Sequence, residues 1–318
     1  MTTYKEIYGT NVEVLSSDPT NPVEGQIWYN STSQTLKGYA LVAGSWATAA
    51  PLNTARYSSN GAGTQTAALA FGSLTNPPPS ISLATESWNG TAWTSVNSLN
   101  TSRGYFSGCG ATNTAALAFG GAATPGLPIS AATESWNGTS WTEVNDLNTA
   151  RYDLGAFGTN TAAIGASGYT TATVGNVESW NGTSWTEVND LNTARYGSSG
   201  AGIQTAGLIF AGVGGGTATE SFNGTNWTTV NPLNQSSNEK AGAGTQTAAL
   251  AFGGNPPAVE SWNGTSWAAV NNLNVGRAYL GGAGTNTAAL AFLGGVPQTA
   301  STESWSGPAV RTVNITVS

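Results

Sequence analysis

The sequence predicts an all-β protein made of repeated units of four short strands, and three observations lead to this prediction. The 19 residues ESWNGTSWTEVNDLNTARY occur twice without a change, at 134–152 and at 178–196. Weaker copies, spaced by 40 to 48 residues, begin at Glu86, Glu220, Glu260 and Glu303. The 318 residues include 42 glycines and 12 tryptophans, which favours tight turns and strands with an aromatic core. Units of this length with four antiparallel strands, repeated around an axis, describe a β-propeller.

The unit at 103–144 shows the four strands in order. The first, at about 105–111, contains mainly glycine and other small residues, which suits a crowded position where neighbouring backbones converge. The second is the apolar run AALAF at 115–119, and such runs suit the middle of a sheet that is covered on both faces. The third and fourth strands, at 133–136 and 140–144, each carry one tryptophan.

The third and fourth strands flank an Asn-Gly pair at 137–138. Asn-Gly between two alternating runs is the strongest short-range signal for a hairpin, because both residues tolerate the positive φ of a type I′ turn. A two-residue loop would place Trp136 opposite Thr139, and Glu134 opposite Trp141. We therefore expect these four side chains to share one face of the hairpin.

Counting each type of strand separately predicts the number of blades. First strands begin at Arg56, Arg103, Arg151, Arg195, about Asn238 and Arg277. The second, third and fourth strands have a seventh candidate each, at 26–30, at 35–40 and around Val310. We predict seven blades in a ring closed by strands from both ends of the chain, with an extended N-terminal arm at 1–22 and the propeller at 23–318. Six blades with an N-terminal hairpin extension is the alternative.

The repeated units also resemble kelch repeats. A double glycine follows the apolar strand at Phe119 and at Phe252, a tryptophan comes after it in the third strand, and an arginine opens the next unit. The units differ from kelch repeats in the tight turn between the third and fourth strands, and in Ser237 where an arginine is expected. The first and third units also lack the double glycine. The resemblance covers the chain from about Gly25 onward and implies a kelch-like β-propeller of four-stranded antiparallel blades.

Composition argues against several classes of function. Only 8% of the residues are charged and the net charge is -7, so the chain lacks the clustered lysines and arginines that bind nucleic acid. No apolar run reaches the roughly 18 residues of a membrane span, and the N-terminus lacks the pattern of a secretory signal. The sequence has no histidine, the commonest catalytic base and metal ligand, and its one cysteine, Cys109, forms no internal disulfide. We therefore expect no enzyme, no metal and no cofactor.

Charged residues recur at two positions of the repeat. Five of the nine basic residues hold one position, and these are Arg56, Arg103, Arg151, Arg195 and Arg277. Six of the 16 acidic residues hold the other, and these are Glu86, Glu134, Glu178, Glu220, Glu260 and Glu303. In a structural interpretation they form contacts that link blade to blade, because buried charges need partners. In a functional interpretation they form repeated sugar-binding pockets, in which tryptophan stacks on the sugar ring.

The loops indicate which face of the propeller recognises a partner. The turns between strands one and two, and between strands three and four, lie on one face and are nearly uniform along the chain. The loops between strands two and three lie on the other face and differ freely, as at 120–132 and 167–176. Since loops on a rigid scaffold carry specificity, this varied face is the candidate recognition surface for sugars or another protein.

A second resemblance concerns the segment PVEGQIWYNSTSQTLKGYALVAGSW at 22–46. It resembles a short module found in virion proteins of tailed phages, particularly fibre and appendage proteins. The resemblance implies a location in the virion, and a protein released by lysis needs no export signal. The preferred hypothesis is a non-enzymatic structural or interaction protein of a phage particle. Residues 1–22 would attach it to other virion proteins by adding a strand to a partner sheet, and its loops would face a host surface glycan or protein or a neighbouring virion protein.

Two alternatives stay open. One is a free glycan-binding lectin that uses the repeated pockets of arginine, glutamate and tryptophan, and the third hypothesis is a glycan-degrading enzyme. The sequence also leaves open the ligand and the formation of a homo-oligomer.

Overall fold

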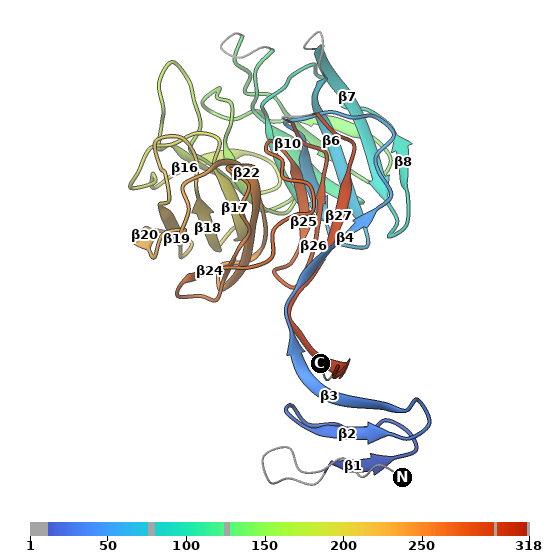
Figure 1. Ribbon diagram of the computed structural model, residues 1–318. Coiled ribbons are helices and arrows are strands. Elements are labelled where there is room, and N and C mark those ends of the chain that lie inside the picture. The colour runs from blue at the N-terminus through green and yellow to red at the C-terminus, as the bar shows by residue number, and fades with distance from the viewer. Residues whose placement is uncertain (1–11, 76–79, 124–127, 296–297, 317–318) are drawn as a thin grey trace. The chain divides into compact units, whose positions relative to one another are not determined.

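The computed structural model describes residues 12–75, 80–123, 128–295 and 298–316. In these ranges every regular element is a strand, and the strands form seven four-stranded sheets (Figure 1). The prediction of an all-β protein is therefore confirmed. The chain divides into two compact units, one of Ser45–Ser306 and one of Met1–Gly44 together with Gly307–Ser318.

Six of the sheets belong to the unit of Ser45–Ser306 and are the blades of a propeller. Blade 1 contains β5 (Asn60–Gly63), β6 (Ala68–Thr75), β7 (Ser80–Trp88) and β8 (Trp93–Val96). Blade 2 contains β9 (Ser107–Thr112), β10 (Ala115–Phe119), β11 (Thr133–Trp136) and β12 (Trp141–Val144). Blade 3 contains β13 (Gly155–Gly158), β14 (Ala163–Ala166), β15 (Val177–Trp180) and β16 (Trp185–Val188). Blade 4 contains β17 (Ser199–Ile203), β18 (Ala206–Phe210), β19 (Thr219–Phe222) and β20 (Trp227–Val230). Blade 5 contains β21 (Asn238–Thr245), β22 (Ala248–Asn255), β23 (Glu260–Trp262) and β24 (Trp267–Ala269). Blade 6 contains β25 (Gly281–Gly284), β26 (Ala288–Phe292), β27 (Thr302–Ser306) and β4 (Ser45–Ala49).

The first strands of the six blades form a closed ring around a central channel. Each of β5, β9, β13, β17 and β21 contacts the first strand of the next blade, and β25 contacts β5. A side chain at Gly61 would lie 2.3 Å from the carbonyl oxygen of Gly282, and one at Gly242 would lie 2.4 Å from that of Gly200. Small residues are therefore required where the first strands converge, as the sequence predicted.

Blade 6 is completed by a strand from the other end of the chain. β4 lies beside β27 (Figure 1), and the two strands pair antiparallel, so that Trp46 faces Trp305. The two rings are 5.3 Å apart, the same spacing as between Trp88 and Trp93 in blade 1. Strands from both ends of the chain thus close the propeller, as predicted.

The number of sheets equals the predicted seven, but the ring contains six blades, which is the alternative that the sequence allowed. The seventh sheet consists of β1 (Glu13–Leu15), β2 (Ile27–Asn30), β3 (Thr35–Val42) and β28 (Ala309–Asn314), and it belongs to the other unit. In a seven-bladed ring, the segment around Val310 would be the fourth strand of a blade. The structure gives the fourth place of the last blade to β4 with Trp46, and β28 with Val310 pairs with β3, because Trp305 in β27 needs a facing tryptophan to complete the paired core of a blade.

The sheet of the second unit also combines both ends of the chain, since β28 pairs antiparallel with β3 and β1 pairs in parallel with β2. The boundary between the units lies at Gly44 rather than at the predicted end of the arm, residue 22. Residues 1–11 of that predicted arm lie outside the described residues.

Asp18 fixes the remainder of the predicted arm to this sheet. Its Oδ1 accepts hydrogen bonds from Trp28 Nε1 at 3.1 Å and Asn30 Nδ2 at 2.7 Å, and Lys37 Nζ lies 2.7 Å from its Oδ2. The hydrogen bonds from Lys37, Asn30 and Trp28 lower the pKa of Asp18 to about 2. Residues 12–22 of the predicted arm are therefore folded onto the sheet and do not form a free extended arm.

The hairpin of the third and fourth strands differs from the predicted two-residue loop. Trp136 faces Trp141 directly, and the loop contains the four residues between them. Asn137 Oδ1 accepts hydrogen bonds from the backbone N–H groups of Thr139 and Ser140, both at 2.9 Å, and of the Asn-Gly pair only Gly138 has a positive φ, at +93°. The asparagine side chain therefore closes a longer turn by itself, and a type I′ turn is not required.

The fourth-strand tryptophan joins each blade to the preceding one. The ring of Trp141 in blade 2 lies 5.0 Å from that of Phe71 in blade 1, and its Nε1 donates to Thr85 Oγ1 at 3.0 Å. Val177 replaces this threonine in blade 3, and there the indole of Trp227 in blade 4 donates to a backbone carbonyl instead. Each buried indole N–H thus keeps a partner, as burial requires.

Candidate functional site: the mouth of the central channel

The arginines and glutamates that the sequence singled out lie inside the blades. Five ion pairs join the arginine before a first strand to the glutamate of the third strand in the same blade: Arg56–Glu86, Arg103–Glu134, Arg151–Glu178, Arg195–Glu220 and Arg277–Glu303. The side chains are at most 2% exposed. Burial lowers the pKa of each arginine, and the facing glutamate offsets part of this effect. No exposed surface remains at these positions for a sugar, which favours the structural interpretation.

Each glutamate also holds the linker that arrives from the preceding blade. In blade 2, Glu134 Oε2 accepts from the N–H of Asn100 at 2.7 Å, and Oε1 accepts from the N–H of Thr101 at 3.2 Å. Asn100 follows β8 of blade 1, and its side chain donates to the carbonyl of Trp141 at 2.9 Å. The ion pair lies within one blade, and its carboxylate makes the link between blades.

Blade 5 lacks the arginine, and a buried lysine provides the cation inside this blade instead. Lys240 Nζ donates to the carbonyls of Gly253 and Ala258, at 3.0 and 2.7 Å, and burial lowers its pKa to about 8. Glu260 still accepts the N–H of the linker residue Asn234 at 2.8 Å. The glutamate therefore has its linker role even where no arginine is present.

Contacts between blades explain why the turns between strands one and two, and between strands three and four, have nearly the same sequence in every blade. The Gln246 side chain, in the turn between strands one and two of blade 5, donates to Ser221 Oγ of blade 4 at 3.0 Å. The turn between strands three and four of blade 3 is likewise held by another blade, since the carbonyl of Thr183 accepts from the Asn145 side chain of blade 2 at 2.9 Å. These turns are occupied by contacts between blades, so the opposite face, which carries the loops between strands two and three, is the one whose sequence is free to vary. Residues 76–79, 124–127 and 296–297 of those loops lie outside the described residues.

Six equivalent residues surround the channel on this varied face, and we call them the mouth ring. They are Ser58, Tyr105, Asp153, Gly197, Glu239 and Tyr279. All six have a positive φ, between 51° and 61°. The backbone N–H groups of five of them donate around the channel to the carbonyl of the preceding member, at 2.8 to 3.2 Å. The backbone thus forms a rigid collar, which leaves the side chains of the ring free to differ from blade to blade.

Two members of the mouth ring are carboxylic acids on either side of Gly197. A side chain at Gly197 would lie 2.5 Å from Glu239 Oε1, so the carboxylate of Glu239 occupies the space above this glycine. Burial and the neighbouring Glu239 raise the pKa of Asp153 well above its usual range, and burial raises that of Glu239 to about 7. The acids interact with each other, so the first proton is lost more easily than the second.

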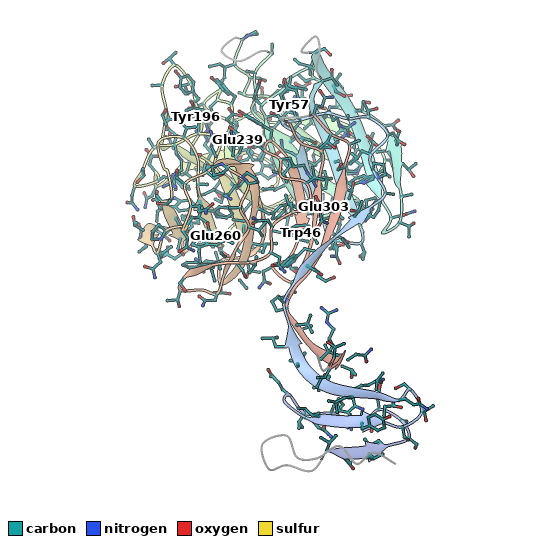
Figure 2. All side chains as sticks on the ribbon, in the orientation of Figure 1. Trp46, Tyr57, Tyr196, Glu239, Glu260 and Glu303 are labelled. Atoms are coloured by element: carbon teal, nitrogen blue, oxygen red, sulfur yellow. The ribbon has the colours of Figure 1, made fainter. Side chains whose placement is uncertain are left out.

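Six of the ten tyrosines lie at this mouth or next to it, and we call them the mouth tyrosines. They are Tyr57, Tyr105, Tyr152, Tyr169, Tyr196 and Tyr279, all of them half-buried. Their rings form two contact series, Tyr57 with Tyr279 at 6.2 Å, and Tyr105 to Tyr152 to Tyr169 to Tyr196 at 5.4 to 6.2 Å. In Figure 2, Tyr57, Tyr196 and Glu239 lie toward the upper end of the propeller, above Trp46, Glu260 and Glu303.

Sequence reasoning missed the mouth ring, although a signal was present. The segment that starts with the arginine is similar in most repeats, but the residue two positions later is serine, tyrosine, aspartate, glycine, glutamate or tyrosine. Variation at one position of a repeated segment indicates that packing does not fix that side chain. Only the structure shows that these six positions lie around one opening.

The two acids make the stability of the propeller dependent on pH. Their pKa values are higher in the folded than in the unfolded chain, so the folded chain binds more protons between about pH 4, the unfolded value, and pH 7. Stability should therefore fall as the pH rises through this window. Tyr105 and Tyr279 line the same cavity as the acids, and burial raises the pKa of each tyrosine further above this window.

The measurement that checks this is the unfolding temperature at pH 5 and at pH 8. We expect the decrease between these values to be smaller in Glu239→Gln than in the natural chain. Glu143→Gln, an exposed residue of β12, serves as the control and should behave like the natural chain. An equal decrease in all three chains would contradict the prediction.

The described part of the chain contains no group of three or more acidic, histidine or cysteine residues that could hold a metal ion, and no helix suited to crossing a membrane. No known protein family matches the chain, and no curated protein does. The geometry of the channel mouth is therefore the basis for a functional hypothesis.

Proposed function

We propose that this chain is a non-enzymatic interaction protein of a tailed-phage particle, with a kelch-like propeller that binds a host surface glycan or a neighbouring virion protein at the mouth of its channel. The observation that carries the proposal is the gathering of tyrosines and two carboxylates on the face with the varied loops. Aromatic rings stack on the apolar faces of sugars, while carboxylates and tyrosine hydroxyls bind their hydroxyl groups. The unit of both chain ends would attach the propeller to the particle, a role first assigned to residues 1–22.

A glycan array probed with the full chain tests the recognition part of the proposal. We expect binding to be lost in a Tyr105→Ala, Tyr279→Ala double variant whose unfolding temperature stays within a few degrees of the natural chain. Tyr39→Ala, in the other unit, is the matched control and should keep full binding. Binding that survives the double variant would move recognition away from the channel mouth.

A second candidate, a glycan-degrading enzyme, is favoured by one observation. Two interacting acids, one of which keeps its proton to about pH 7, resemble the acid pair of glycoside hydrolases. Release of new sugar ends from host envelope polysaccharide, lost in Glu239→Gln, would support the enzyme and contradict the non-enzymatic proposal.

A further inference from the structure

Asp153 and Glu239 form no ion pair with a cationic residue in the part of the propeller that the structure describes. The five arginines there are paired with other glutamates, and Lys240 Nζ donates to two carbonyls instead. Two acids in a confined opening without a cation are unfavourable for folding, because desolvation disfavours their charged forms. An external cation would remove this cost.

The surroundings of the acids fit one kind of cation. Tyr105 and Tyr279 line the same cavity as the two acids, and Tyr57 lies against Tyr279. Ser58 also lines the cavity, and its Oγ is a buried atom without a hydrogen-bond partner. Aromatic rings attract ammonium groups through their negative faces, and an unpaired hydroxyl oxygen can accept an N–H group or contact the positive methyl groups of a quaternary ammonium.

We propose that the mouth ring binds an alkylammonium group, such as an amino or quaternary ammonium substituent on a surface glycan, between Asp153 and Glu239 and against the tyrosines. This inference rests on the proposed function and specifies the chemistry of its ligand. The carboxylates supply the charge, the rings contact the alkyl groups, and Gly197 leaves the space that the Glu239 carboxylate occupies.

A divalent metal ion fits the same position less well. Calcium takes six to eight oxygen ligands, whereas the mouth ring offers two carboxylates. Five of the backbone carbonyls of the ring already accept hydrogen bonds from neighbouring members. The aromatic rings around the opening supply no metal ligand other than the tyrosine hydroxyls.

The test is calorimetric titration of the full chain at pH 8 with choline and with 3,3-dimethylbutan-1-ol, a neutral molecule of nearly the same shape. We expect choline to bind at least about tenfold more tightly, since only the charged probe gains from the carboxylates and the ring faces. An Asp153→Asn, Glu239→Gln double variant should lose at least about tenfold in choline affinity. Glu143→Gln removes an exposed charge elsewhere in the propeller and should leave the affinity unchanged.

Several results would overturn the inference. These are equal affinity for the two probes, no binding of choline, or a choline affinity that the double acid variant retains. A calcium-dependent rise in unfolding temperature, lost in the double variant and without any effect of choline, would replace the ammonium by a metal ion. Glycan binding that depends on Tyr105 and Tyr279 but not on the two acids would overturn this inference and leave the proposed function standing.

Discussion

A chain that consists of residues 50–306 is expected to lose the closed ring, because it lacks β4 and leaves blade 6 with three strands. Five residue pairs join β4 to β27, and the buried ring of Trp46 lies 5.4 Å from that of Phe252 in blade 5. Loss of one buried tryptophan side chain alone costs about 3–5 kcal/mol. The truncation also exposes the edge of β27, which invites aggregation.

The matched control is residues 45–306, which differ only in the presence of β4. We expect this chain to unfold in urea at the midpoint of the propeller in the full chain, because its six blades close without the other unit. The shorter chain should have a free energy of unfolding lower by at least about 3–5 kcal/mol, or should aggregate. Equal midpoints for the two truncated chains would refute closure by β4.

Replacement of Glu134 by alanine is expected to cost about 3–5 kcal/mol of the free energy of unfolding, the usual effect of removing one partner from a buried ion pair. The Arg103 guanidinium, which lies 2.9 Å from Glu134 and is 1% exposed, would stay buried without its counter-charge. The N–H groups of Asn100 and Thr101 would also lose their acceptor. The variant therefore affects both blade 2 and the linker from blade 1.

Glu143→Ala is the control, because Glu143 faces Glu134 across β11 and β12 but is exposed. Surface substitutions of this kind usually change the free energy of unfolding by no more than about 0.5 kcal/mol. Glu134→Gln should fall between the two, since the amide oxygen can still accept from the linker while the charge is lost. Urea unfolding followed by tryptophan fluorescence measures all three. A Glu134→Ala chain as stable as Glu143→Ala would show that the buried pair is not needed.

The repeat could be predicted from the sequence because the same residues make the same packing contacts in each blade. The glycines of the first strand, the AALAF run and the two tryptophans recur at fixed places, and the structure puts each where its residue type suggested. The hairpin turn was misread because the Asn-Gly signal for a type I′ turn competes with the ability of Asn137 Oδ1 to accept two backbone N–H groups. Local signals of this kind identify a turn more reliably than its length.

The sequence by itself determined the strands, their order within a blade, the burial of the aromatic residues and the involvement of both chain ends, since all of these depend on contacts that repeat. Only the tertiary structure decided that β4 joins β27 while β28 joins β3, because strand pairing between distant segments depends on which facing residues complete a core. It also decided that Asp153 and Glu239 meet at one opening. Asp153 and Glu239 belong to different repeats, and only the closure of the ring brings equivalent positions of the repeats around a common axis.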